Sequence, residues 1–239
     1  MKCSKAHLVC VCTFLLAAIS AYGQQRVNLG VDAGESSDQY GAQSAVTGPI
    51  VDLNAQGIIL FGNKKSGSPD VLASGEAILP TDPNNHAKEY AVYGGLRWHV
   101  GNFSFGFDGG IRKILPPTAF LDNQYYNRDS MELLEIPGTI RYNFWKEKRA
   151  YVQVQGAPEF GPRLKVPASS PLFTNPVLYK PNFDHAYFIR PSVGYNFGKW
   201  YVRATYENRF FRFQDNANNP EGLYNWKTNA ITGGVGVNF

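Results

Sequence analysis

The last eleven residues of the chain constrain its fold more than any other stretch. From Asn229 to Phe239, large apolar side chains alternate with small or polar ones. The apolar positions are Ile231, Val235, Val237 and Phe239, and the positions between them include Thr232, Gly234, Gly236 and Asn238. Because successive side chains of a strand point to opposite faces, this pattern predicts a β-strand with one apolar and one polar face. The strand ends on an aromatic residue.

The first residues predict a secretory signal peptide. Lys2 and Lys5 supply positive charge, and Leu8 to Ile19 form an apolar run. Ala21 and Gly23 place small residues where a signal peptidase reads the chain. We expect cleavage after Gly23, so that residues 1–23 are the signal peptide and residues 24–239 a single mature domain. A helical membrane span takes about 20 apolar residues. Neither this run nor any later one reaches that length, so we expect no helical span.

Composition narrows the class further. All 3 cysteines lie inside the predicted signal peptide, which excludes disulfides and thiolate chemistry from the mature chain. Loss of Lys2 and Lys5 lowers the formal charge from +4 to +2, too little to indicate a nucleic-acid partner. The chain has 24 glycines, 14 tyrosines and 16 phenylalanines but no long apolar run. This composition fits a transmembrane barrel better than a soluble core.

Three hairpins repeat the alternation of the last strand. They turn at Gly101-Asn102, at residues 145–148 and at Gly198-Lys199, and each strand keeps its charges on one face. Aromatic residues concentrate beside the three turns and at the chain end, which favours a membrane-interface girdle over the general preference of aromatics for strands. These are Trp98, Phe103, Tyr142, Phe144, Trp145, Tyr195, Phe197, Trp200, Tyr201 and Phe239.

The connections between hairpins are long: Lys113 to Ser130, Gly161 to His185 and Gln214 to Thr228. Short turns at one end and long loops at the other are typical of bacterial outer-membrane barrels. The hairpins and the last strand make seven strands, and a closed barrel of this class needs an even number. Val27 to Ala33 is the best eighth strand, so we expect eight. Pro49 to Phe61 and Val71 to Leu79 are the alternative, because they could add two strands and give ten.

This arrangement resembles the small outer-membrane β-barrels of the OmpA/OmpX type. The resemblance covers the signal peptide, the rhythm of the hairpins and the aromatic C-terminus. It implies an all-β, closed antiparallel barrel in a Gram-negative outer membrane, with periplasmic turns and extracellular loops. It also implies contact with lipid and lipopolysaccharide, and recognition of the last strand by the barrel-assembly machinery. The OmpA pattern continues into a peptidoglycan-binding domain, which we do not expect here.

The polar faces would line the lumen and carry a near-balanced set of charges. Six are basic and five acidic: Arg97, Arg112, Arg141, Arg190, Arg203 and Arg209, with Glu89, Asp108, Glu135, Glu159 and Glu207. These charges should pair, because an unpaired charge in a narrow interior is costly. Folding the second hairpin sets Glu135 opposite Glu159. Two facing carboxyls indicate a protonated group or a bound cation, unless Arg112 on the neighbouring strand bridges them.

No catalytic, cofactor or metal site is predicted. His86, His99 and His185 have no recognisable nucleophile beside them, and metal-ligand and phosphate-binding motifs are missing. We therefore expect a non-enzymatic outer-membrane protein with a structural role or with aromatic and basic loops that contact a partner. The alternatives are a narrow or gated porin-like channel and a membrane-embedded hydrolase. A ten-stranded barrel would favour the channel, and a serine that meets a histidine in the fold would favour the hydrolase.

Overall fold

The computed structural model describes residues 25–40, 44–59, 69–115, 131–145, 147, 149–164, 183–213 and 225–239. These residues form strands and their connections. The strands are β1 (Gln25–Tyr40), β2 (Val46–Ile59), β3 (Asp70–Pro80), β4 (Lys88–Val100), β5 (Phe103–Leu115), β6 (Met131–Glu135), β7 (Gly138–Phe144), β8 (Ala150–Leu164), β9 (Phe183–Asn196), β10 (Trp200–Phe213) and β11 (Asn225–Asn238). Within the described ranges, no helix is long and apolar enough to cross a membrane. The predicted signal peptide lies outside them.

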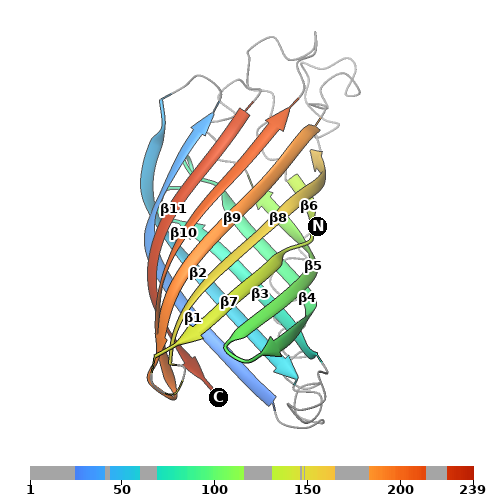
Figure 1. The fold of residues 1–239 in the computed structure, drawn as a ribbon. Coiled ribbons are helices and arrows are strands. Elements are labelled where there is room, and N and C mark those ends of the chain that lie inside the picture. The colour runs from blue at the N-terminus through green and yellow to red at the C-terminus, as the bar shows by residue number, and fades with distance from the viewer. Residues whose placement is uncertain are drawn as a thin grey trace, which may run out of the picture.

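The strands form one closed antiparallel ring (Figure 1). Apart from β6 and β7, strands that are consecutive in sequence pair with each other, and β1 also pairs with β11, from Asn28 opposite Asn238 to Tyr40 opposite Trp226. Beyond Asn28, Val27 and Phe239 exchange backbone hydrogen bonds of 3.2 and 2.8 Å. A ring leaves no unpaired sheet edge. The predicted closed all-β barrel is therefore confirmed, including the pairing of the first strand with the last.

The ring has ten strands. β6 and β7 share one position, because both pair with β5 on one side and with β8 on the other. They are separated at Pro137, which has no N–H to donate to a ladder. The expectation of eight strands is wrong and the alternative of ten is right. The two added strands are β2 and β3, which include most of the two segments named for this role.

The connections divide between two ends of the barrel. We call the end at which β1, β3, β5, β8 and β10 finish the loop end, and the end at which β2, β4, β7, β9 and β11 finish the turn end. Two turns depend on glycine, since Gly101 has φ 62° and Gly198 φ 89°. The three long connections expected to contact a partner lie largely outside the described residues.

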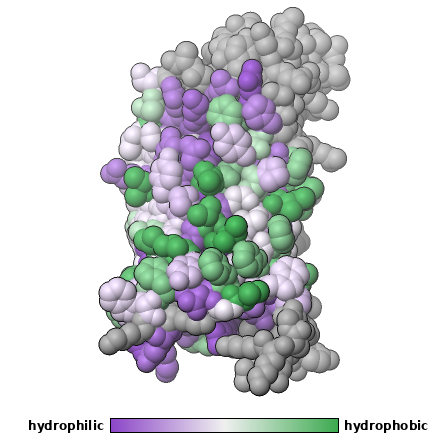
Figure 2. Space-filling model, viewed as in Figure 1, coloured by the Kyte–Doolittle hydropathy of each residue, from purple (hydrophilic) through white to green (hydrophobic). Residues whose placement is uncertain are grey.

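The outer face of the barrel wall is apolar, and its inner face is polar and charged. On β11, Ile231 and Val235 are 67% and 55% exposed, and Phe239 directly after it is 71% exposed, whereas Thr228 and Thr232 on the opposite face are buried. Val237 is half-buried. The other strands alternate in the same way, and Figure 2 shows hydrophobic residues gathered in a band on the outer surface. An apolar exterior around a charged interior reverses the pattern of soluble proteins and is what a lipid-facing barrel requires.

One predicted girdle residue, Tyr201, and one residue of the predicted loop from Gln214 to Thr228, Trp226, lie elsewhere than expected. Trp145, Trp200 and Phe197 are exposed on the outer surface near the turn end, as a girdle requires. Tyr201, however, points into the lumen and donates a hydrogen bond of 3.5 Å to Asn54. Trp226 belongs to β11 and not to a loop, and its side chain is 1% exposed inside the barrel.

Candidate functional site

The loop-end half of the lumen is filled by ionised side chains. Arg112 on β5 has no exposed surface and contacts three carboxylates. Its Nη1 lies 2.7 Å from Glu89, its Nη2 2.8 Å from Glu76 and its Nε 2.8 Å from Glu135. The inward alternation of β3 to β6 places the three carboxylates around this one guanidinium, which makes every N–H edge of the arginine a charge-assisted donor.

Two further arginines extend these contacts across the barrel. Arg190 on β9 lies 2.6 Å from Glu76 on β3, and Arg209 on β10 contacts Glu89 on β4. In each pair the two strands stand five positions apart in the ring of ten, so the ion pairs join opposite walls. Together with Glu135, Glu159, Glu207 and Arg112, these residues form what we call the charge network. It closes the lumen by direct contact between opposite walls.

Glu135 and Glu159 face each other in the register of β6 and β8, as the sequence predicted. Arg112 contacts Glu135, but the arginine that reaches both carboxyls is Arg209, whose Nε lies 2.9 Å from Glu159 and whose Nη2 lies 3.8 Å from Glu135. The predicted bridge by Arg112 is therefore wrong. The strand that carries Arg209, β10, is three positions from β6 and two from β8 in the ring, so neighbouring-strand reasoning could not find it.

An apolar layer covers the charge network toward the loop end. Ile114, Leu133, Phe211 and Trp226 are at most 1% exposed, and the Phe211 and Trp226 rings stack with centroids 4.9 Å apart. On β1, Asp38 accepts hydrogen bonds from Thr228 (2.7 Å) and Trp226 (3.3 Å) and lies 2.7 Å from His86 Nδ1. This layer and the charge network together occupy the loop-end half of the lumen.

The 81–87 connection holds His86 in place. The His86 N–H donates to the Asp82 carbonyl at 3.1 Å, which closes a tight turn beside β1. Within this turn, the Asn84 backbone N–H donates to the Asp82 carboxylate at 3.0 Å and lowers the pKa of that group. The turn therefore directs a buried imidazole at Asp38, which explains a histidine that sequence reasoning left without a role.

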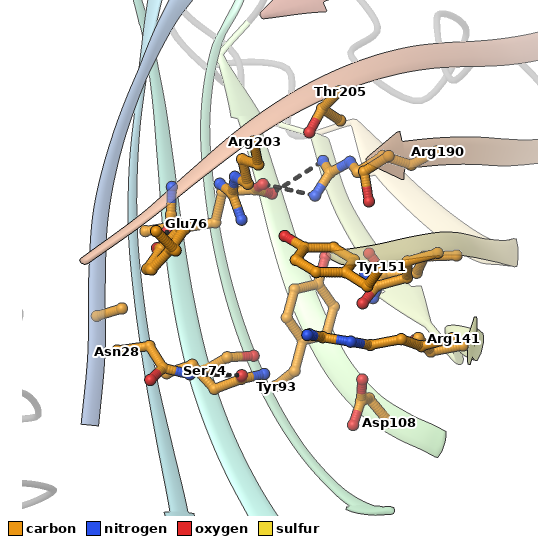
Figure 3. A pocket seen from close by; sticks show the side chains of 18 of the residues that line it. Asn28, Ser74, Glu76, Tyr93, Asp108, Arg141, Tyr151, Arg190, Arg203 and Thr205 are labelled. Carbon is orange, nitrogen blue, oxygen red and sulfur yellow. Dashed lines mark hydrogen bonds and ion pairs between the residues drawn. The ribbon is translucent and has the colours of Figure 1, made fainter. Parts of the chain in front are cut away.

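The turn-end half of the lumen is hollow. A polar cavity of about 170 Å³ lies here, and Figure 3 shows Arg141, Tyr151 and Asp108 on one wall with Asn28 and Ser74 on the other. Arg203 at its side pairs with Asp32, which also accepts a 3.2 Å hydrogen bond from Asn54. The lining includes Asn196 and Asn238, which lie next to the turns. The cavity thus extends from the charge network to the turn end.

A serine, a histidine and a carboxylate form a chain at the turn end. His99 Nδ1 lies 3.0 Å from Ser104 Oγ, and His99 Nε2 lies 2.8 Å from Asp70 Oδ2. This order of groups is that of a Ser-His-Asp triad, which is recognised by geometry and not by sequence position. The expectation that no nucleophile lies beside a histidine is wrong, because Ser104 contacts His99. A hairpin folded at Gly101-Asn102 sets His99 directly opposite Ser104, so this contact could have been predicted from the position of the turn.

Access to this triad is uneven. The side chain of His99 is 51% exposed, but Ser104 is only 3% exposed. Catalysis of acyl transfer needs a substrate carbonyl within reach of the serine oxygen and donors for the developing oxyanion. The base is open to solvent in this arrangement, whereas the nucleophile is covered.

The structure places all eleven predicted lumen charges on inward positions of the wall. Glu89, Arg112, Glu135, Glu159, Arg190, Glu207 and Arg209 lie in the charge network, Arg203 pairs with Asp32, and Arg97, Asp108 and Arg141 line the cavity. Sequence reasoning missed Glu76, which joins two arginines of the network. The alternation Asp70, Leu72, Ser74, Glu76 in β3 is the signal that could have found it.

The lumen is more acidic than expected. The first three strands add five inward acidic residues to the predicted set: Asp32, Asp38, Asp52, Asp70 and Glu76. Together with the five predicted acidic residues they make ten, against the six predicted arginines. The predicted near balance of six against five is wrong. Even so, no group of three histidine, cysteine, aspartate or glutamate side chains in the described residues is arranged to hold a metal ion.

Comparison with known proteins gives similarity in structure but not in sequence. No protein-family model matches the chain, and no curated protein matches it. Neisserial surface protein A is 9% identical, with 89% of this chain and 97% of that chain covered and a TM-score of 0.39. The translocator domain of the autotransporter NalP from Neisseria meningitidis is 11% identical, with 97% and 95% covered and a TM-score of 0.40. Ail of Yersinia pestis is 9% identical, with 91% and 100% covered and a TM-score of 0.29. Superpositions of this quality do not transfer a function.

Proposed function

We propose that this protein is an integral outer-membrane barrel that is closed to free passage of solutes. The exposed apolar band around a charged lumen supports a membrane location, since only closed barrels and helices satisfy their backbone groups in lipid. Among the described residues, the strands of the closed barrel are the elements that would cross the membrane. The same alternation also supports export through the predicted signal peptide, as well as contact with outer-membrane lipid and lipopolysaccharide.

The proposal that the barrel is closed rests on the two ion pairs that join opposite walls of the lumen, Arg190–Glu76 and Arg209–Glu89. Arg112 and Arg209 have no exposed surface, and Glu135 and Glu159 are at most 2% exposed. A water-filled path through this layer would expose these side chains. Function then belongs to the surface of the barrel and to the loop end, which agrees with a structural or partner-binding role and with docking of the last strand on the assembly machinery.

Conductance of single molecules in a planar bilayer tests the proposal. The refolded protein is first shown to be folded by its heat-modifiable migration on a gel. We expect no conductance steps from the folded wild type, and steps from an Arg112→Ala, Arg209→Ala double variant that keeps heat-modifiable migration. Reproducible steps from the wild type would overturn the closed state and favour a narrow channel, for which the cavity at the turn end would be the inner vestibule.

The Ser104–His99–Asp70 chain favours a second candidate function, a membrane-embedded esterase. In this reaction the Ser104 hydroxyl would attack an ester carbonyl while His99 Nδ1 takes its proton and later returns it to the leaving alcohol. Water would then release the acyl group from the serine. Labelling of the folded protein with a fluorophosphonate tests this candidate. Labelling that Ser104→Ala and His99→Gln abolish would support it, and no labelling of the folded wild type would exclude it.

A further inference from the structure

Two arginines of the cavity lack the acidic partners that all other lumen arginines have. Arg112, Arg190, Arg203 and Arg209 each contact at least one carboxylate. In the described part of the chain, by contrast, no carboxylate oxygen lies within 4.0 Å of Arg97 or Arg141. Both side chains line the cavity. A guanidinium without a counter-charge in a narrow interior is costly, so its position needs an explanation.

Arg141 is fixed in place and keeps one edge free. Its Cζ lies 3.7 Å from the centroid of the Tyr151 ring, and its Nε donates to Asn143 at 2.9 Å. These contacts hold the plane of the guanidinium without using its two terminal nitrogens. Figure 3 shows the side chain reaching from its strand into the cavity below Tyr151. The terminal nitrogens thus remain available as a fork, the geometry that binds oxyanions in a bidentate manner.

Arg97 faces the same space from the other side. It pairs in register with Gly106 on β5, and Gly106 pairs in turn with Thr139 on β7, two residues before Arg141. A Cβ placed on Gly106 would lie 3.7 Å from Arg97 Nε and 3.7 Å from the Thr139 Cβ. Because position 106 has no side chain, the space between the two neighbours stays open. The positive charges of Arg97 and Arg141 are close enough to act on each other.

A third group points to a ligand independently of the arginines. Thr139 is 4% exposed, lines the cavity, and its hydroxyl has no hydrogen-bond partner among the described residues. A buried hydroxyl is normally paired, and one left unpaired destabilises the folded protein. Gly106 alone stands between Thr139 and Arg97 in the strand pairing, and Arg141 follows Thr139 by two residues on the same face of β7. An oxyanion in this part of the cavity would have donors from all three residues close by.

We propose that Arg97, Thr139 and Arg141 form a binding site for a small oxyanion. Asp108 and Asp70 both act on Arg97, but neither carboxylate lies within 4.0 Å of it, and Asp70 already lies 2.8 Å from His99 Nε2. The two guanidiniums therefore have no direct counter-charge in the cavity. The cavity of about 170 Å³ admits a phosphate, a sulfate or a short carboxylate but not a large solute. The charge network closes the loop end, so the ligand enters from the turn end. The site therefore serves solutes on the periplasmic side of a barrel that does not conduct.

Stabilisation by inorganic phosphate tests this site. Urea unfolding of the full chain in lipid vesicles is compared in phosphate and in chloride at equal ionic strength. Binding to the folded state raises the folded-to-unfolded ratio about tenfold when phosphate stands at about ten times its dissociation constant. We expect this gain in the wild type and its loss in an Arg97→Gln, Arg141→Gln double variant. Arg203→Gln is the matched control, because it removes a lumen arginine that is already paired with Asp32.

Thr139→Val separates binding from structural damage. Valine has the shape of threonine but no hydroxyl, and in chloride we expect stability equal to or above that of the wild type, since an unpaired buried hydroxyl is lost. In phosphate, the gain in the folded-to-unfolded ratio should fall severalfold. An equal gain in the wild type, Thr139→Val and the double variant would show a general salt effect and overturn the proposal. Acetate in place of phosphate tells whether carboxylates are also accepted.

Discussion

At the scale of single residues, Arg112 shows how the lumen is held together. Its guanidinium is enclosed by Glu76, Glu89 and Glu135 and also donates to the Tyr93 hydroxyl at 2.8 Å. Removal of a buried charge leaves its partners uncompensated, which is more damaging than loss of the contacts alone. The carboxylates would then repel each other in a space without water. The stability of the barrel therefore depends on each arginine of the charge network.

Arg112→Ala should lower the free energy of unfolding by about 3–5 kcal/mol, the cost of breaking a buried ion pair. Urea titration of the barrel in lipid vesicles, followed by tryptophan fluorescence, measures this change. Lys113→Ala is the matched control, because Lys113 is the next residue on β5 and is exposed on the outer face. A loss in Arg112→Ala no larger than that of the control would contradict the charge network as a source of stability.

Much of the lumen could be read from the sequence residue by residue, but only some of its ion pairs could. Alternation gives the inward face of each strand, which is why the predicted charges point into the lumen, and the hairpin register brings Arg190 to Glu207. Glu76, which also contacts Arg190, and Glu89, which contacts Arg209, lie on strands half-way round the ring from these arginines. Such pairs depend on the number of strands and on the barrel's diameter, neither of which a hairpin contains. The Ser104–His99 pair was within reach, since it lies in one hairpin.

At the scale of elements, glycines make room for tyrosines inside the wall. The Tyr151 ring on β8 lies over Gly194 on β9, and the Tyr201 ring on β10 lies over Gly236 on β11. A Cβ at either glycine would overlap the ring that covers it. These tyrosines line the cavity, and Tyr151 supports Arg141. The glycines therefore shape the turn-end half of the lumen and not only the bend of the sheet.

Gly194→Val should destabilise the barrel by about 1–3 kcal/mol, the usual cost of overpacking, because the Tyr151 ring has to move. Gly233→Val is the control, since nothing lies within 4 Å of a Cβ at Gly233, which is exposed on the outer face. Urea midpoints of the two variants in the same vesicles give the comparison. The proposed role of glycine at position 194 fails if both variants unfold at the same urea concentration.

The sequence predicted those strands in which aromatic and β-branched residues alternate regularly with polar ones. It left open whether β2 and β3 are strands of the barrel. β2 contains Gly48, Pro49 and Gly57, and its inward positions include both Asp52 and Ile50. A strand with glycine, proline and a buried apolar residue on its lumen face departs from the simple alternation. Its assignment comes from pairing with β1 and β3, which is a long-range property.

At the scale of the whole molecule, the barrel has an apolar surface outside and two different layers inside. The lumen is filled at the loop end and hollow at the turn end, so the two ends of the barrel differ, while an apolar band surrounds the outside. The four tryptophans report on this arrangement, since Trp200 is 59% exposed on the outside and Trp226 is 1% exposed in the lumen.

Brominated lipids should quench these two tryptophans differently. We expect strong quenching in a variant that keeps only Trp200 and little in one that keeps only Trp226, with the other tryptophans changed to phenylalanine. Bromine on the acyl chains quenches by contact, so only a side chain that faces lipid is affected. Equal quenching of both variants, or none in either, would contradict the membrane orientation.

The closure of the ring has a consequence for the order of the chain. Val27 on the first strand and Phe239 at the end of the last strand are joined by backbone hydrogen bonds, so residues 25 and 239 lie at the same end of the barrel. A short linker could connect them, and new termini could be opened at the Gly198-Lys199 turn. Every strand of such a circular permutant would keep both of its neighbours. The cyclic sequence of strands, and not the point at which the chain is cut, then specifies the barrel.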